Sequence, residues 1–377
     1  MKKNNTTNII EYIRRILLLW VLTALASACS DMHEPLLHIK GTTAVQPQIE
    51  QNVNINMMWE ADWQAHWQVD WDTEAKGEIG YTEPETYHMN YFRSGSKELA
   101  GERDMVSGGI RINLDYGNYD LLLYNNDYES MQIDRADDWS WVTASTTADP
   151  YAQLPDSITP NGPLRRMPEQ LFSMFATDVH VSDNLDDYEY LPDEGIYLLH
   201  LNSQLLPRTF IYLLQVELKN NDGRVTGCGS STIDGLASSV DLLSTLNDEV
   251  PVAHQFSSFY QEKTGEDGKP LCLIGGRMTT FGLCGISPWD ESKRTEGTRA
   301  LPRVATGNTC YVQLQYSNGG RRYVAVDITA QMRDKLTGGV INITLDLNEY
   351  TPPKPDTEGG FDVNVDDWDE EDHHTNV

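Results

Sequence analysis

Short runs in which apolar and polar residues alternate recur along most of the chain. The clearest is residues 340–347, and residues 110–114 show the same alternation after two glycines. A period of two places every second side chain on one face of a strand, so these runs predict half-buried β-strands. Residues 119–124 are almost continuously apolar and predict a buried strand. Further strand candidates are residues 53–57, 87–92, 131–133, 196–201, 210–218, 310–316 and 323–328.

Few segments have a helical pattern. Residues 169–176 predict one or two helical turns, and residues 234–246 and 330–336 predict short helices. Residues 144–168 are rich in Pro, Ser and Thr and predict a long surface loop. Many short strands joined by Gly, Pro and Asn turns indicate an all-β protein with two tandem β-sandwich domains.

The same pattern divides the chain into five parts. They are a signal peptide at residues 1–28, a flexible tether at 29–50, β-sandwich domains at 51–190 and 191–350, and an acidic, Pro-rich tail at 351–377. Within the tail, residues 361–365 alternate again and could form an edge strand.

The first residues have the three zones of an export signal. Lys2, Lys3, Arg14 and Arg15 give a positive start, and residues 16–22 form an apolar run. This run is too short to span a hydrocarbon core of about 30 Å as a helix. Charge, a short apolar segment and small residues before position 29 together predict a secretory signal peptide.

Cys29 follows directly after the small residues 25–28 (Leu-Ala-Ser-Ala). This segment resembles the lipobox of bacterial lipoproteins, although Ala26 stands where leucine is more common. The resemblance implies that Cys29 becomes the new N-terminus and carries fatty acyl chains such as palmitate. Because each buried methylene contributes about 0.8 kcal/mol, two or more chains anchor a protein stably in a membrane. The alternative is a cleaved leader followed by an incidental cysteine.

The charge of the chain narrows its possible partners. It has 57 acidic and 28 basic residues, which gives a formal net charge of −29. Nucleic acid binding needs clusters of Lys and Arg, so nucleic acid is excluded as a partner. The acidity also opposes contact with an anionic lipid surface, which leaves the lipid on Cys29 as the membrane attachment.

The remaining cysteines leave two alternatives open. Cys228, Cys272, Cys284 and Cys310 could form disulfides in an exported protein, with three possible pairings. They could equally be buried free thiols. Their spacing lacks the C-x-x-C pattern of zinc and thioredoxin-like sites.

Four tryptophans occur at intervals of four residues: Trp59, Trp63, Trp67 and Trp71. Both a helix and a strand would place them on one side. Exposed indole rings can stack on sugar rings, so this set is a candidate glycan contact. The alternative is that the rings cover the hydrophobic core, because an indole has a large apolar area.

No pattern of catalytic residues stands out, so we predict no enzymatic activity, no cofactor and no metal site. Gly275, Gly276 and Arg277 lack the lysine and hydroxyl of a phosphate-binding loop. The acidic residues 183–194 lack the spacing of a calcium loop and predict a solvated surface.

Several segments resemble the fimbrillin-like lipoproteins of Bacteroidales, a family that includes fimbrial anchoring subunits. They are residues 119–125 after a Gly-Asn turn, 168–172 (Pro-Glu-Gln-Leu-Phe), 216–218, 231–243 and the C-terminal phrase 359–368. The resemblance implies tandem transthyretin-like β-sandwiches on the outer membrane, with fimbrial subunits as partners and assembly by strand exchange. Residues 361–365 are the strand that such exchange would involve.

The family resemblance also bears on processing. Stalk subunits of such fimbriae are cut after an arginine and lose their lipid, but no Arg lies between Cys29 and Arg93. We therefore expect the lipid to be kept, as in an anchor or accessory subunit, unless a lysine-specific protease cuts at Lys40. The alternative function is a glycan- or host-binding surface lipoprotein that uses the tryptophans.

Overall fold

The computed structural model describes residues 45–53, 63–106, 110–111, 114–193, 196–265, 268–289 and 307–354. The chain divides into two compact units, Met1–Ala44 and Val45–Val377, and every described residue belongs to the second. The regular secondary structure of the described residues is almost entirely β-strand, which confirms the predicted all-β class. Within the described residues, no helix has the length and hydropathy needed to cross a bilayer. Cys29 and the predicted signal peptide lie outside this part of the chain.

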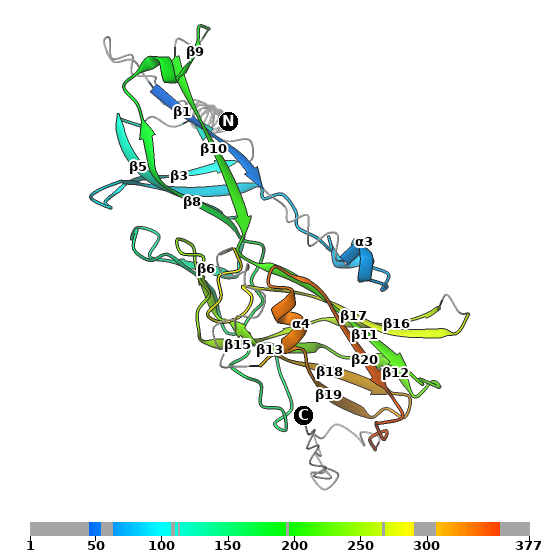
Figure 1. Cartoon of the computed structure of the whole chain (residues 1–377). Helices are drawn as coiled ribbons and strands as arrows, with labels where there is room; N and C mark the ends of the chain where they lie inside the picture. Colours follow the sequence, from blue (N-terminus) through cyan, green and yellow to red (C-terminus); the bar gives the residue numbers. More distant parts are fainter. Residues whose placement is uncertain are drawn as a thin grey trace, which may run out of the picture. The chain divides into compact units, whose positions relative to one another are not determined.

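One sheet of eight strands has the order β3-β2-β5-β8-β10-β1-β4, with β9 also paired to β10. β1 and β10 run parallel, side by side (Figure 1), and the other neighbours are antiparallel. The strands are β1 (Val45–Val53), β2 (Thr86–Arg93), β3 (Leu99–Val106), β4 (Ile110–Arg111), β5 (Gly117–Asn125), β8 (Phe172–Val181), β9 (Glu189–Leu191) and β10 (Ile196–Pro207). The predicted tether, residues 29–50, thus includes the start of strand β1.

The predicted buried strand at residues 119–124 is confirmed as part of β5. Tyr119, Leu121 and Leu123 belong to one hydrophobic cluster, whereas Leu122 and Tyr124 belong to another. Alternate residues of a strand point to opposite faces, so a strand buried on both faces has an almost continuous apolar sequence.

The helical turns predicted at residues 169–176 are wrong, because β8 occupies most of this segment. β8 pairs with β5 on one side and with the end of β10 on the other. Leu171 and Phe172 are both fully buried but pack in different clusters, as consecutive residues of an extended chain do. Pairing with distant strands therefore outweighs the local pattern.

The helix predicted at residues 234–246 is also wrong, since β13 (Ser231–Ala237) and β14 (Ser239–Asp241) lie there. Gly235 has a φ of +70°, outside the helical range. The Asp234 carboxylate accepts hydrogen bonds from the backbone N–H groups of Asn161 (2.8 Å) and Thr309 (2.7 Å). Long-range partners thus fix an extended backbone in a segment with an apparently helical pattern.

Two sheets of the second half share the largest hydrophobic core. Their orders are β16-β17-β11-β20 and β12-β18-β13-β15, with β19 beside β18. The further strands are β11 (Phe210–Lys219), β12 (Val225–Cys228), β15 (Pro251–Phe256), β16 (Ser258–Thr264), β17 (Pro270–Thr280), β18 (Thr309–Tyr316), β19 (Arg321–Asp327) and β20 (Gly339–Asp346). The alternation at residues 340–347 is confirmed as β20, and the helix expected at 330–336 is α4 (Thr329–Asp334).

A small sheet joins segments from both sides of the boundary predicted near residue 190. It has the order β14-β7-β6, with β6 at Met131–Asp134 and β7 at Thr143–Thr146. Strand β10, beyond residue 190, also belongs to the eight-stranded sheet. The domain limits themselves stay a prediction.

The Pro-rich loop at residues 147–168 lies along strand β15. The N–H of Arg165 donates to the carbonyl of Ala253 (3.0 Å), and the N–H of Ala253 donates to the carbonyl of Pro163 (3.0 Å). The N–H of Arg166 donates to the carbonyl of Thr147 (3.0 Å), which closes the loop on itself. The loop therefore covers the edge of the five-stranded sheet, which would otherwise be open to another chain.

The fully buried His254 of β15 predicts a specific loss of stability in acid. Its Nδ1 lies 3.0 Å from the carbonyl oxygen of Arg165, and burial lowers the pKa of the imidazole to about 4. The unfolded chain binds a proton below about pH 6.5, so the free energy of unfolding falls from pH 6.5 towards pH 4. For this one group the loss is on the order of 3 kcal/mol.

We expect His254→Gln to flatten the pH dependence of urea unfolding over this range, because the amide cannot titrate and can still donate to Arg165. Thr232→Ser, a conservative change in the neighbouring strand, serves as the control. Equal pH slopes in the wild type and His254→Gln would contradict the prediction.

Candidate functional site

The tryptophan segment, residues 63–82, lies on the outer face of the sheet β16-β17-β11-β20. It contains a helical turn at residues 63–66 and helix α3 (Thr73–Lys76). The Asp72 carboxylate caps α3 by accepting from the N–H of Ala75 (3.1 Å), and Gly77 ends it with a φ of +77°. A favourable cap and a C-terminal glycine explain why so short a helix forms here.

Trp63 and Trp67 pack together against Ile211, Leu213 and Val340. Both rings are half-buried, and both Nε1 atoms are buried. A sugar bound from solvent would therefore meet ring edges and not the indole N–H groups. The interval of four residues places these two rings on one side of a helical turn, as the sequence predicts.

Polar contacts hold the tryptophan segment to strands β11 and β17 of the same sheet. The backbone N–H of Gln68 donates to Oε1 of Gln215 on β11 (2.6 Å), and Nε2 of Gln215 donates to the carbonyl of His66 (3.2 Å). Further along, Nε of Arg277 donates to the carbonyl of Ile79 (2.8 Å). Gln215 and Arg277 of the sheet face thus have hydrogen-bond partners in the segment, which help to fix its position.

Val69 packs in the space above Gly275, whose missing side chain makes this contact possible. A Cβ at Gly275 would lie 2.7 Å from Cγ1 of Val69 and 2.8 Å from the ring of Phe259. Gly275, one of the two glycines compared above with a phosphate-binding loop, therefore allows close packing of the tryptophan segment.

Trp71 belongs to a separate aromatic group. Its ring meets Phe259 edge to face, with centroids 5.9 Å apart, and its Nε1 donates to the carbonyl of Gly77 (2.8 Å). Nζ of Lys76 lies 3.4 Å from the Phe259 centroid. Three members of the set, Trp63, Trp67 and Trp71, thus pack against other side chains. Trp59 lies outside the described residues. Glycan contact by the set stays a prediction.

Cys228, Cys272, Cys284 and Cys310 form no disulfide with one another. Cys272, Cys284 and Cys310 are buried, and Cys228 is half-buried. The disulfide alternative is therefore not realised in this structure. Burial raises the pKa of the Cys228 thiol to about 12 and also raises that of Cys310. Such thiols stay protonated at neutral pH and are poor nucleophiles.

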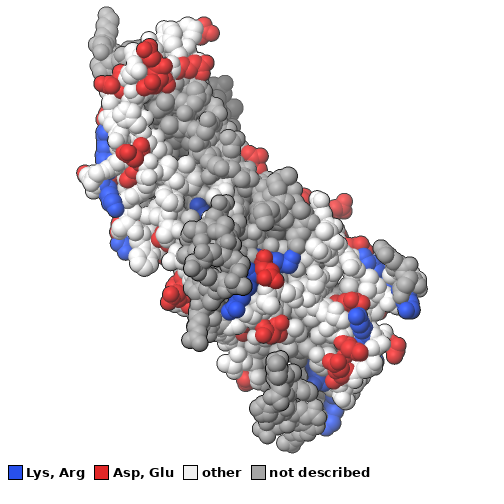
Figure 2. Space-filling model, viewed as in Figure 1, with Lys and Arg blue, Asp and Glu red and all other residues white. Residues whose placement is uncertain are grey.

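Carboxylates gather around η1 (Leu185–Asp187) and β9, where Figure 2 shows a group of acidic side chains. The exposed members are Asp183, Asp186, Asp187, Glu189 and Asp193. Across the described ranges, no three His, Cys, Asp or Glu side chains converge in a way that could hold a metal ion. The carboxylates of this loop are open to solvent.

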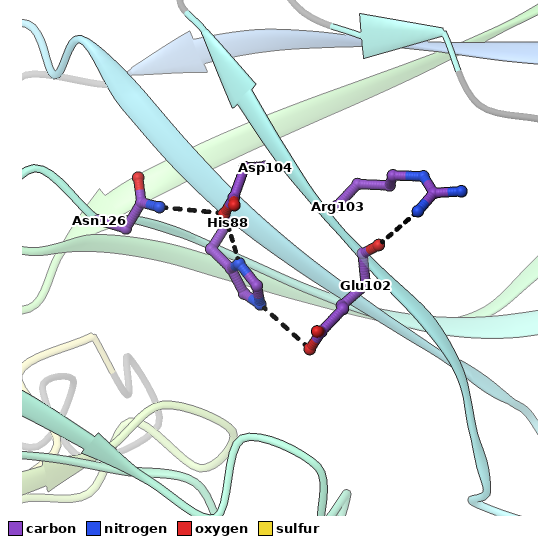
Figure 3. Close-up of polar contacts among 5 residues, drawn as sticks. All are labelled: His88, Glu102, Arg103, Asp104 and Asn126. Atoms are coloured by element: carbon purple, nitrogen blue, oxygen red, sulfur yellow. Dashed lines mark hydrogen bonds and ion pairs between the residues drawn. The ribbon is translucent and has the colours of Figure 1, made fainter. Parts of the chain in front are cut away.

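A polar cluster that the sequence pattern does not indicate lies at the edge strand β3 (Figure 3). Nδ1 of His88 on β2 lies 2.7 Å from Oδ1 of Asp104, and its Nε2 lies 3.8 Å from Oε2 of Glu102. Nδ2 of Asn126 donates to the same oxygen of Asp104 (3.1 Å). Because β3 has β2 as its neighbour on one side only, these side-chain contacts reinforce its attachment to the sheet.

Three known structures resemble the chain at low sequence identity. A candidate adhesin from Bacteroides ovatus is 13% identical with a TM-score of 0.48, over 84% of this chain and 95% of that one. A candidate adhesin from Bacteroides thetaiotaomicron is 8% identical with a TM-score of 0.45, over 81% and 93%. The fimbrial anchor protein Mfa2 from Porphyromonas gingivalis is 11% identical with a TM-score of 0.39, over 80% and 90%. No protein-family model and no curated protein matches the sequence.

These proteins are described as adhesion and fimbrial proteins of Bacteroidales, the group that the sequence motifs resemble. Three of the motif segments lie in or directly before strands: residues 119–125 in β5, residues 168–172 leading into β8, and residues 231–237 in β13. The C-terminal phrase 359–368 lies outside the described residues.

Removing the Trp67 ring tests whether the tryptophans are structural. We expect Trp67→Ala to lower the free energy of unfolding by about 2 kcal/mol, part of the roughly 3–5 kcal/mol for a fully buried ring. Trp141, whose side chain is 57% exposed, is the matched control, and Trp141→Ala should change stability by less than about 0.5 kcal/mol. Equal stability of the two variants would contradict the packing role.

The His88 cluster predicts the local stability of β3. We expect His88→Ala to speed amide hydrogen exchange in β3 about fivefold, because contacts to a carboxylate contribute roughly 1 kcal/mol. Exchange in the central strand β5 should stay the same. Arg103→Ala is the control, since the Arg103 guanidinium contacts the exposed carbonyl of Glu102 (3.3 Å) and not His88. Unchanged exchange in His88→Ala would show that the cluster adds nothing to the edge.

Proposed function

We propose that the chain is a lipid-anchored outer-membrane protein that serves as an anchor or accessory subunit of fimbriae. The observation that carries this proposal is Cys29, placed directly after small residues at the end of an export signal. The lipid on Cys29 attaches the chain to the membrane, and the acidic body stays in solvent. Fimbrial subunits are the partners that the motif resemblance implies.

The position of the first arginine after Cys29 supports retention of the lipid. Arg93 is the last residue of β2, and its side chain reaches Oδ2 of Asp115 (3.3 Å). A protease that cuts after Arg93 would therefore have to open the eight-stranded sheet. Lys40 precedes β1, so a cut there would release the lipid and leave the first strand in place.

Assembly through strands requires an available sheet edge, and β3 and β16 are edge strands among the described residues. Both have charged side chains, including Glu102 and Asp104 on β3 and Glu262 and Lys263 on β16. Charges on an edge discourage unspecific pairing but permit a partner with matching charges. The candidate donor strand, residues 361–365, lies outside the described residues.

The alternative is a glycan- or host-binding surface lipoprotein. The packing of Trp63, Trp67 and Trp71 against the sheet disfavours the predicted tryptophan contact. Trp141 and Tyr151, which are 57% and 84% exposed, are aromatic rings that solvent reaches. A glycan array with Trp141→Ala and Tyr151→Ala as comparison variants would test this function.

Lipid attachment at Cys29 can be tested directly. We expect the wild type to incorporate an alkyne-tagged palmitate and to sediment with the outer membrane, and Cys29→Ala to lose both properties. Cys228→Ala removes a half-buried free thiol and should keep the label, which makes it the matched control. A labelled, membrane-bound Cys29→Ala protein would overturn the proposed anchor.

Fimbrial assembly has a separate test. We expect chemical crosslinking on intact cells, followed by purification of the chain, to recover fimbrial subunits. Deletion of residues 361–365 should abolish their recovery if this strand mediates the contact, and deletion of residues 369–377 should not. A chain that crosslinks to no neighbour would contradict the fimbrial role and leave the lipid result standing.

A further inference from the structure

The described chain contains two parallel strand pairs, β1 with β10 and β20 with β11, and β10 and β11 follow each other directly in the sequence. All nine residues of β1 pair with β10, from Val45 opposite Tyr197 to Val53 opposite Leu205. All eight residues of β20 pair with β11, from Gly339 opposite Tyr212 to Asp346 opposite Lys219. The other pairings between named strands in the described residues are antiparallel.

Parallel pairing determines how these strands respond to tension. A pull on the N-terminal end of β1 and on the C-terminal end of β10 moves the two strands in opposite directions along their axes. The hydrogen bonds of a parallel ladder are evenly spaced along the strands, so such a shear loads all of them together. A pull on two adjacent ends would instead open the ladder one bond at a time.

The two parallel pairs are connected in series with almost no slack. β10 ends at Pro207 and β11 begins at Phe210, so Arg208 and Thr209 alone separate them. Tension from β1 therefore passes through β10 into β11, and from β11 into β20. At this second pair β11 is pulled at its N-terminal end and β20 at its C-terminal end, which is again a shear.

The β10–β11 junction is locked to its surroundings. The backbone N–H of Arg208 donates to the carbonyl of Leu171 (2.6 Å), and the N–H of Leu171 donates to Oγ1 of Thr209 (3.0 Å). Nε and Nη2 of the buried Arg208 donate to Oγ and the carbonyl of Ser173, at 2.6 and 3.1 Å. A junction held in this way transmits force without unfolding first.

Strand β20, the last strand of the path, is also held at the edge that faces away from β11. The side-chain amide of Gln331 on α4 donates to the carbonyl of Asn342 (2.8 Å) and accepts from its N–H (2.9 Å). Gln331 thus pairs with the backbone of β20 as a residue of another strand would. Beyond the strand, Nη1 of Arg224 donates to the carbonyl of Leu347 (2.9 Å).

We propose that β1–β10 and β11–β20 form one load-bearing path that carries tension between the residues before Val45 and those after Asp346. The shear geometry depends on strand pairing alone. That the load comes from a membrane tether on one side and a bound partner on the other rests on the proposed function. The path allows the chain to stay folded while it is pulled at both ends.

The test is single-molecule pulling of the full-length chain with optical tweezers. Handles are inserted between Gly41 and Thr42 and after Val377, which loads both pairs in shear. In the comparison version the second handle follows Asp193, an exposed residue just before β10, so that β1 and β10 are pulled apart from adjacent ends. We expect a rupture force several-fold higher in the first geometry, and equal forces would overturn the proposal.

A matched pair of proline variants tests the ladder itself. Pro47 has no N–H group, so its position fits the side of β1 that faces away from β10. By alternation, the backbone of Glu50 faces β10 and that of Gln51 faces away. We expect Glu50→Pro to lower the end-to-end rupture force and Gln51→Pro to leave it near the wild-type value; equal effects would contradict the assignment.

The result can be separated from the proposed function, because the protein pulled in vitro needs neither lipid nor partner. If Glu50→Pro fails to fold, the comparison of handle positions in the unsubstituted ladder still decides. Equal rupture forces in the two pulling geometries, together with palmitate labelling of Cys29, would contradict the proposed load-bearing path and support the proposed lipid anchor.

Discussion

The second half of the molecule depends on strand β11, which is buried on both faces and paired at both edges. Tyr212, Leu214 and Val216 contribute to the core between the two sheets, whereas Ile211 and Leu213 meet the tryptophan segment. β17 and β20 satisfy its backbone on either side. Because a β-strand in water cannot leave such a face exposed, residues 63–82 must cover it.

This covering explains the unusual aromatic content of a segment with little regular structure. Trp63 and Trp67 supply apolar area from a short stretch of chain, and Val69 fits where Gly275 leaves room. Trp63 and Trp67 thus cover a sheet face over which the described chain places no complete layer of helices or strands. Cys272, Cys284 and Cys310 likewise serve in packing, because each is buried and behaves as a small apolar side chain.

Much of the strand content follows from the sequence because alternation is a local property. β5 and β20 could be predicted from their own residues, as could the all-β class. β8 and β13 could not, because β8 is defined by its pairing with β5 and β13 by the contacts of Asp234 to Asn161 and Thr309. The cluster at His88 could not be predicted either, because it depends on the pairing register of β2 and β3, which places His88 opposite Asp104. The charged residues of β3 give no local signal of this register. The parallel direction of β1 has no signature in its sequence at all.

The hydrogen bonds of the loop at residues 147–168 have a consequence for its resistance to proteolysis. Arg165 and Arg166 are sites that trypsin-like enzymes recognise, and such enzymes need several consecutive residues in an extended, accessible form. A protease cannot bind this segment until the loop detaches from β15. Hydrogen bonds hold it there: Arg165 and Pro163 bond to Ala253, and Arg166 bonds to Thr147. Digestion at these arginines is then governed by the equilibrium for local opening and not by the presence of the basic residues. A long, proline-rich connection can in this way resist cleavage while the protein stays folded.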